Sequence, residues 1–307
     1  MAKNDNLGDF LSDIADAIRE KKGTTEPINA QDFASEIASI SGGGSDSPTP
    51  GMPVIGDGKT YLYIKIAEKG RMTVPLYFSQ TVANGVVIDW GDGSATQTLS
   101  GTGNVDATHT YAEIGEYTIS LNPSNGCTLG LGHNSSSYCV MGSTGNNGKV
   151  YVNMLQAVEI GKNVTSIGSY AFSNCSSLAS VVILDGVTSI GNYAFYYCYS
   201  LTSVVIPGSV TIILGNAFAY CWSLASVMIP GSVTSISANA FRYCYGMAFY
   251  DFRTAKSVPT LGGTLVFDSI PSDCKIVVPD SLYDTWIAAT NWSTHASKII
   301  KASEFNG

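Results

Sequence analysis

The stretch Val187-Thr-Ser-Ile-Gly-Asn-Tyr-Ala-Phe-Tyr-Tyr-Cys-Tyr-Ser-Leu-Thr-Ser-Val-Val-Ile-Pro-Gly208 is one copy of a unit that recurs every 23 residues between Leu155 and Gly246. Apolar positions stay in step from copy to copy. The rows in step are Phe172, Phe195, Phe218 and Phe241; Cys175, Cys198, Cys221 and Cys244; Leu178, Leu201, Leu224 and Met247; and Ile167, Ile190, Ile213 and Ile236. A fixed period of roughly 20 to 30 residues predicts a solenoid, because one unit cannot bury its apolar side without stacking on a neighbour.

Each unit predicts a short strand, a turn and a helical turn. Leu201 to Ile206 is β-branched with alternating inward positions, and Pro207-Gly208 closes it. The spacing of Phe195, Cys198 and Leu201 is that of a helical turn facing the core. The motif Ile-Gly-x-x-Ala-Phe-x-x-Cys-x-Ser-Leu-x-x-Val-x-Ile-Pro, matched by residues 190 to 207, resembles the BspA-like (Treponema-type) leucine-rich repeat. Leu214 and Ser237 replace the motif glycine in the next copies, so we expect local irregularity there.

The positions around the repeated cysteine change strongly between copies, from Ser or Asn to Tyr, Trp, Arg or Ala. A close-packed core does not tolerate such volume changes, so we expect these positions to face solvent. Stacking would align them into an aromatic ridge, the predicted ligand-binding surface. Its residues are Tyr196, Tyr197, Tyr199, Tyr220, Trp222, Arg242, Tyr243 and Tyr245. Exposed Tyr and Trp on a rigid scaffold are typical of binding surfaces. The alternative is that these tyrosines only cover neighbouring repeats.

The first 51 residues predict an attachment segment and a linker. Residues 1–40 hold two amphipathic helical patterns, the first over residues 5–21 with an apolar stripe; residues 41–51, rich in Gly, Ser and Pro, read as a flexible linker. The apolar stripe consists of Leu7, Phe10, Leu11, Ile14, Ala17 and Ile18. The segment resembles the N-terminal part of tail-associated structural proteins of bacteriophages, which implies attachment to other tail proteins. A generic hairpin for oligomerisation is the alternative.

Residues 52–150 carry short alternating strands with Gly and Asp turns, which predicts a β-sandwich. The stretch Asp89-Trp-Gly-Asp-Gly-Ser94, followed by His109-Thr-Tyr111, resembles a PKD-type immunoglobulin-like domain and implies a structural spacer. Asp89, Asp92 and His109 could suggest a metal or catalytic site. We instead expect the aspartates to cap turn amides and the histidine strand to pack beneath them, since calcium requires about six oxygen ligands or more.

We predict that the leucine-rich repeats occupy residues 151–257. A degraded repeat and a cap follow at residues 258–307. The cap includes a helical pattern from residue 280, and we expect Trp286 and Trp292 to belong to its core. The predicted fold class is mainly β and multidomain: an N-terminal helical segment, a PKD/Ig-like β-sandwich, and a leucine-rich-repeat solenoid with a C-terminal helical cap.

Composition excludes several function classes. The net charge of −8 over 307 residues argues against a nucleic-acid partner, and no apolar run approaches membrane-spanning length. The N-terminus shows no apolar signal region, so ordinary secretion is not expected. The seven cysteines lack metal-ligand spacing, and we expect the repeated four to be buried free thiols. We predict no catalytic residues, no metal and no cofactor.

These features together predict a non-enzymatic adhesion protein. The first hypothesis is a phage tail-associated receptor-binding protein, located in the virion, homo-oligomeric, and bound through its ridge to a bacterial surface glycan or protein. The second is a bacterial cell-surface leucine-rich-repeat adhesin that binds host proteins. The third is a glycan-cleaving enzyme with a concealed site.

Overall fold

The computed structural model describes residues 57–132, 138–143 and 149–305. The predictions for residues 1–40 and 41–51 lie outside them. The described chain is mainly β, as the sequence predicts, and contains short helices only. Within these residues, no helix combines the length and the apolar character needed to cross a membrane.

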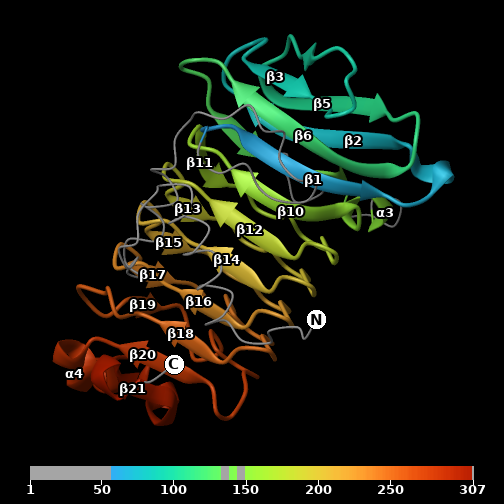
Figure 1. The fold of residues 1–307 in the computed structure, drawn as a ribbon. Helices are drawn as coiled ribbons and strands as arrows, with labels where there is room; N and C mark the ends of the chain where they lie inside the picture. The colour runs from blue at the N-terminus through green and yellow to red at the C-terminus, as the bar shows by residue number, and fades with distance from the viewer. Residues whose placement is uncertain (1–56, 133–137, 144–148, 306–307) are drawn as a thin grey trace, which may run out of the picture.

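The first part of the chain forms two groups of strands, drawn at the top of Figure 1. One group contains β1 (Thr60–Ile66), β3 (Val86–Asp89), β4 (Gln97–Thr98) and β6 (Gly115–Pro123); the other contains β2 (Thr73–Gln80), β5 (Gly103–Thr110) and β7 (Leu129–Leu131). Apolar residues at every second position favour strands with one buried face. In β2, for example, Val74, Leu76 and Phe78 are buried, and the residues between them are partly exposed. The short elements η1 (Lys69–Arg71), β8 (Tyr138–Cys139), β9 (Gly142–Ser143) and α3 (Lys149–Val152) complete this part.

The repeats supply parallel strands that stack below this part (Figure 1). One row comprises β10 (Leu155–Ile160), β12 (Ser180–Ile183), β14 (Ser203–Val205), β16 (Ser226–Met228), β18 (Phe249–Asp251), β20 (Lys275–Val278) and β21 (Ile299–Lys301). The other comprises β11 (Val164–Ile167), β13 (Ser189–Ile190), β15 (Ile212–Ile213), β17 (Ser235–Ile236) and β19 (Thr260–Leu261). Equivalent residues pair across repeats, for example Ile167 with Ile190 and Val181 with Val204. The 23-residue period therefore becomes in-register stacking.

Both sheets run without interruption from the first part into the repeats. β10 pairs antiparallel with β1, and β11 pairs with β7, so the strand orders are β14-β12-β10-β1-β6-β3-β4 and β19-β17-β15-β13-β11-β7-β2-β5. One hydrophobic core extends from Leu62 to Ile299. The boundary predicted at residues 150 and 151 thus separates two sequence patterns that share one core. The first part covers the strand edges at which the solenoid would otherwise begin, as a terminal unit must.

The motif departures at Leu214 and Ser237 do not disturb the stacking. The backbone N–H of Gly191 donates to the Ile167 carbonyl at 2.9 Å, and those of Leu214 and Ser237 make the equivalent bonds at 2.9 Å each. The hydrogen-bond pattern between the repeats therefore stays regular at both positions. A Cβ atom at Gly191 would lie 2.7 Å from the backbone of the preceding repeat, so the local backbone around Leu214 and Ser237 must be placed slightly differently to accept a side chain.

The C-terminal cap closes the other end, at the bottom of Figure 1. It comprises η2 (Asp280–Leu282), α4 (Tyr283–Ala288), η3 (Ser293–Lys298) and η4 (Ala302–Glu304). Trp286 and Trp292 are fully buried, and their rings pack on each other with centroids 5.2 Å apart and on Phe252. The Trp292 indole N–H donates to the Pro259 carbonyl at 2.7 Å. The prediction that both tryptophans belong to the core of the cap is confirmed.

Candidate binding surface

The helical turn of each repeat is fixed by a buried set of side chains that we call the core ladder: Phe172, Phe195, Phe218 and Phe241 with Cys175, Cys198, Cys221 and Cys244. All eight are 0% exposed. Successive phenylalanine rings stack almost parallel, with centroids 5.1 to 5.2 Å apart. The thiols of the last three cysteines donate to the carbonyls of Phe172, Phe195 and Phe218 at 3.2 to 3.3 Å. All cysteines among the described residues are buried free thiols.

The residues directly before each cysteine form a second row, the tyrosine ladder: Tyr197, Tyr220 and Tyr243. Their ring centroids lie 4.6 and 4.5 Å apart, and the rings are half-buried. Their φ angles are 62°, 64° and 61°, in the left-handed region, where the first repeat has Asn174 at 65°. In this conformation each backbone N–H donates to a carbonyl of the next repeat, as from Tyr220 to Arg242 at 2.9 Å. Left-handed geometry costs an L-residue about 1 to 2 kcal/mol, and less for Asn, so the tyrosines are not there for local backbone preference.

The residues directly after each cysteine form the outer ladder: Tyr199, Trp222 and Tyr245. Tyr199 and Trp222 have ring centroids 4.3 Å apart, and Trp222 and Tyr245 lie at 6.2 Å. Trp222 is 45% exposed and Tyr245 is 53% exposed, which makes them two of the most exposed large apolar side chains in the described chain. The outer ladder rests on the tyrosine ladder, since Tyr197 contacts Tyr199 and Tyr243 contacts Tyr245. Trp222 lies between Tyr199 and Tyr245, so neighbouring rings hold it in place while Trp222 and Tyr245 stay open to solvent.

The position two residues before each cysteine is less exposed to solvent than the sequence predicts. Tyr196 and Arg242 are half-buried, but Ser173 and Ala219 are 2% and 0% exposed. The expectation that this whole row faces solvent was wrong, because the short Ser and Ala side chains do not project far from the buried backbone. Tyr196 packs on Tyr197 and Tyr220, with ring centroids 4.0 and 5.5 Å away.

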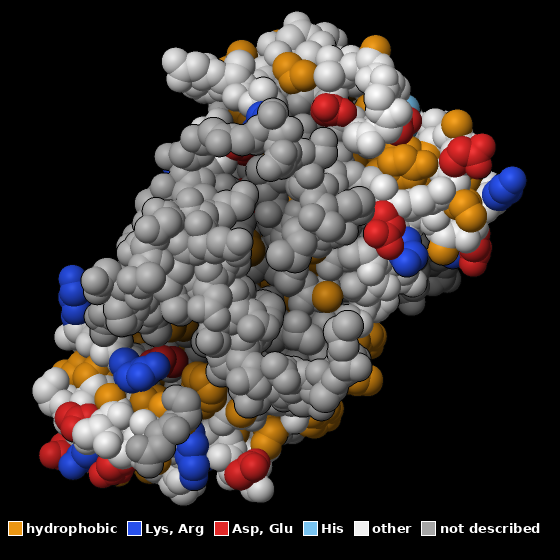
Figure 2. Space-filling model, in the orientation of Figure 1, with side chains coloured by type: hydrophobic (Ala, Val, Ile, Leu, Met, Phe, Trp, Pro, Cys, Tyr) orange, Lys and Arg blue, Asp and Glu red, His pale blue; other side chains and the backbone are white. Residues whose placement is uncertain are grey.

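The predicted ridge residues thus come together on one side of the solenoid. Arg242 is the one charged member; its Nε atom donates to Asp268 Oδ2 at 2.9 Å, and its guanidinium lies 4.5 Å from the centroid of the Tyr243 ring. Burial raises the pKa of Tyr196, Tyr199 and Tyr220, so their hydroxyl groups are neutral at physiological pH. Figure 2 shows charged side chains mainly over the first strands and the C-terminal end, with hydrophobic side chains along the visible edge of the repeats between them.

Sequence reasoning missed an adjacent aromatic pair. Tyr170 and Tyr193 stack with centroids 4.8 Å apart, and Tyr193 also contacts Tyr196 edge-on at 5.1 Å. Both have positive φ, as do Asn216 and Asn239 at the same position of the next repeats. The exchange of Tyr for Asn was the available signal, because Asn is the common residue of left-handed backbone.

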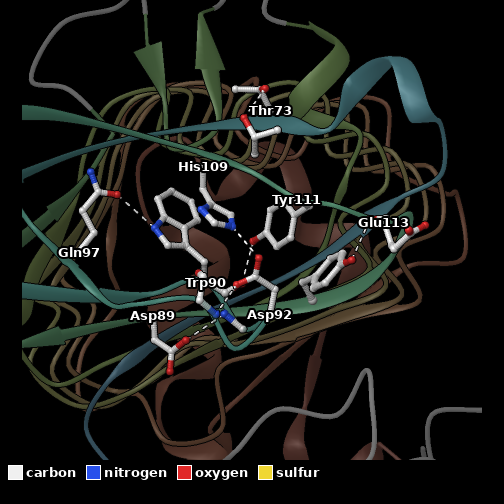
Figure 3. Close-up of polar contacts among 12 residues, drawn as sticks. Thr73, Asp89, Trp90, Asp92, Gln97, His109, Tyr111 and Glu113 are labelled. Carbon is white, nitrogen blue, oxygen red and sulfur yellow. Dashed lines mark hydrogen bonds and ion pairs between the residues drawn. The ribbon is translucent and has the colours of Figure 1, made fainter.

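The Asp89–Ser94 turn is a structural cluster (Figure 3). Asp89 Oδ1 accepts from the Gly91 N–H at 2.9 Å, and Asp92 Oδ1 accepts from the Ser94 N–H at 3.0 Å. His109 Nε2 lies 2.7 Å from Asp92 Oδ2 and its ring stacks on Trp90 at 5.0 Å. Hydrogen bonds, first from Ser94 and then from His109, hold the pKa of Asp92 at about 2. The turn-capping interpretation is confirmed.

Tyr111 packs against the same cluster and bonds to its backbone. Its hydroxyl donates to the Trp90 carbonyl at 2.8 Å, and Tyr111 and Trp90 are each 1% exposed. The Trp90 indole N–H donates to Gln97 Oε1 at 3.1 Å. Among the described residues, no group of three or more His, Cys, Asp or Glu side chains is placed to hold a metal ion.

Residues 149–265 match the family described as the BspA type leucine rich repeat region, in six copies. This region of the chain is a leucine-rich repeat of the BspA type. It contains every residue of the ridge. The chain matches none of the curated proteins.

Similar solved structures include two whose names describe them as leucine-rich proteins. A leucine-rich repeat protein from Bacteroides ovatus is 24% identical over 48% of this chain and 42% of its own (TM-score 0.38). A leucine rich cell surface protein from Faecalibacterium prausnitzii is 30% identical over 51% and 42% (TM-score 0.35). The pneumococcal vaccine antigen PcpA is 16% identical over 48% and 40% (TM-score 0.38). This chain therefore spans less than half the length of each. The resemblances to PKD-type domains and to phage tail proteins stay predictions.

Proposed function

We propose that this chain is a non-enzymatic binding protein that uses the aromatic ridge to engage a partner protein. The observation that carries the proposal is the outer ladder, in which Trp222 and Tyr245 are 45% and 53% exposed on a rigid aromatic base. Burying such rings in an interface costs little conformational entropy, because neighbouring aromatic rings already hold them. Tyr, Trp and Arg are also the residue types enriched among binding hot spots.

A protein partner fits this surface better than a glycan. The outer rings are tilted against one another by 46° and 47°, and each partly covers its neighbour. Sugar rings stack on flat, open aromatic faces, whereas a protein partner can insert side chains between tilted rings. Glycan binding is an outcome that the test below distinguishes.

Display at a bacterial cell surface is the setting that we favour, with a phage tail as the alternative. The ridge lies entirely within the BspA-type repeat region, residues 149–265. The resemblance to phage tail proteins is carried by residues 1–40, outside the described residues. Antibody detection on intact uninfected cells would support the cell-surface setting, and detection in purified virions alone would support the tail.

The binding test compares the full chain with a variant in which Tyr199, Trp222 and Tyr245 are all changed to Ser. We expect the variant to bind intact target cells at least about 30-fold more weakly, since hot spots contribute about 2 kcal/mol or more each. The matched control is Ile212→Ser, which removes an exposed apolar side chain from the far sheet, where Ser189 and Ser235 already hold the equivalent positions.

Two outcomes would contradict the proposal. Equal binding by the ridge variant and the Ile212→Ser control would move the binding site elsewhere. Binding that survives protease treatment of the target surface, but is lost when its glycans are removed, would identify a glycan in place of a protein.

A further inference from the structure

The sheet that begins with β1 has a second apolar face, turned away from the core. In β1 and β10, Leu62 and Val158 belong to the main core, whereas Tyr61, Tyr63 and Ala157 form a separate cluster on the opposite side. The pairing register extends this side across the repeats, because Glu159 aligns with Val182 and Val182 aligns with Val205. We call this side the outer face; its apolar members are Tyr61, Tyr63, Ala157, Val182, Val205 and Met228.

Burial on the outer face is greatest next to the first described residues. Tyr61, Tyr63 and Ala157 are 7%, 4% and 6% exposed, whereas Met228 in the fourth repeat strand is 39% exposed. Within the described ranges, no further apolar side chain packs on the Tyr61–Tyr63–Ala157 cluster. The outer face thus becomes more exposed from β1 toward β16.

We propose that the amphipathic segment of residues 5–21 packs across the outer face of its own chain. Its apolar stripe, Leu7 to Ile18, needs a surface to cover it, because a 40-residue segment cannot form a core of its own. A helix of this length spans about 25 Å. Strands lie about 4.8 Å apart, so such a helix reaches from β1 to β16.

Two features of the chain suit this arrangement. The segment is tethered to Asp57, which accepts a hydrogen bond from the Tyr61 hydroxyl at 2.6 Å beside the cluster. The connection from the segment to Asp57, residues 22–56, includes the predicted flexible linker 41–51, which alone spans about 15 to 20 Å, so the helix can return to the sheet. Serines at Ser180, Ser203 and Ser226 lie beside the apolar row and leave room for a helix to approach closely.

A tether favours the chain's own segment over one from a second copy. The covalent connection through residues 22–56 keeps the segment near its own sheet, so its local concentration exceeds that of a segment from a second copy in dilute solution. A second copy would need a comparable protein concentration to compete. The arrangement leaves the aromatic ridge open, because the ridge lies on the turns that precede the strands and not on the outer face.

The test measures thiol labelling of a Val182→Cys variant of the full chain. The native cysteines in the described chain are buried, so the new thiol is the reactive one. We expect Ile14→Asp, which places a charge in the apolar stripe, to raise the labelling rate of Val182→Cys at least about tenfold, because a docked segment admits reagent only when it opens. Ser12→Asp, on the polar side of the predicted helix, is the matched control and should leave the rate unchanged.

A second probe guards against loss of the fold. Thr211→Cys lies on the exposed side of the other sheet, and its labelling rate should be the same with and without Ile14→Asp. Equal labelling of Val182→Cys with and without Ile14→Asp would overturn the proposal. Protection that disappears on dilution would also overturn it, because that result identifies a second copy as the occupant.

Discussion

Phe195 and Tyr199 are four residues apart in the same repeat, yet their rows differ in composition, burial and ring geometry. The core ladder repeats the same Phe and Cys in every copy, its side chains are 0% exposed, and its rings are parallel to within 3° to 8°. The outer ladder alternates Tyr and Trp, with rings tilted by 46° and 47°. At a fully buried position, close packing fixes the volume of the side chain and the angle between neighbouring rings. A row that is open to solvent on one side accepts side chains of different size. The contrast separates positions that hold the solenoid from positions that can carry specificity.

The largest effect expected from this contrast is on the core ladder. Phe218→Ala removes the middle ring of the stack and should lower the free energy of unfolding by about 3 to 5 kcal/mol, because the slot between Phe195 and Phe241 cannot collapse. Denaturant titration measures the change, with Ile212→Ser expected within about 0.5 kcal/mol of the native chain. A loss below about 1 kcal/mol for Phe218→Ala would show that the stack is not close-packed.

A smaller effect on the free energy of unfolding is expected when the pH is raised and the core-ladder thiols ionise. Burial raises the pKa of Cys244 from 9.0 to about 12, so the fold stabilises the neutral thiol. That stabilisation is complete below about pH 9 and is lost as pH rises toward 12, at about 1.4 kcal/mol per pH unit for each such group.

Cys244→Ala isolates this contribution. Between pH 8 and 11 the variant should lose about 2 kcal/mol less stability than the native chain, measured by denaturant titration at each pH. Other groups that ionise in this range are common to both proteins. Parallel pH profiles would mean that the Cys244 thiol ionises equally in the folded and unfolded chains.

The smallest effect is expected in the tyrosine ladder. Tyr220→Asn should relieve about 1 kcal/mol of left-handed backbone cost, and the lost ring contacts should offset this gain. The net change in the free energy of unfolding should stay within about 1 kcal/mol. Tyr220→Ala, which loses the same contacts without the Asn preference, should be less stable than Tyr220→Asn. A loss above about 2 kcal/mol for Tyr220→Asn would show that the ladder is a stacking seam and would favour the purely structural interpretation.

The repeat alignment predicted part of the ridge, and the rest depended on packing between the repeats. The change from Asn174 to Tyr197, Tyr220 and Tyr243 at one repeat position predicted a row outside the core. In the structure the three tyrosines are half-buried and lie outside the core. The burial of Ser173 and Ala219 was not predictable, since it depends on how the repeats pack around each short side chain. A repeat alignment shows which residues share a position but not which neighbour covers it.

The sequence by itself determined the solenoid, because a 23-residue period with fixed Phe, Cys and Leu permits only in-register stacking. It also determined the turn-capping role of Asp89 and Asp92, which is local chemistry. Only the tertiary structure decided that β1 pairs with β10 and β7 with β11, which joins the first strands and the repeats in one core. Strand pairing between distant segments leaves no local pattern, since any open sheet edge offers the same backbone hydrogen bonds.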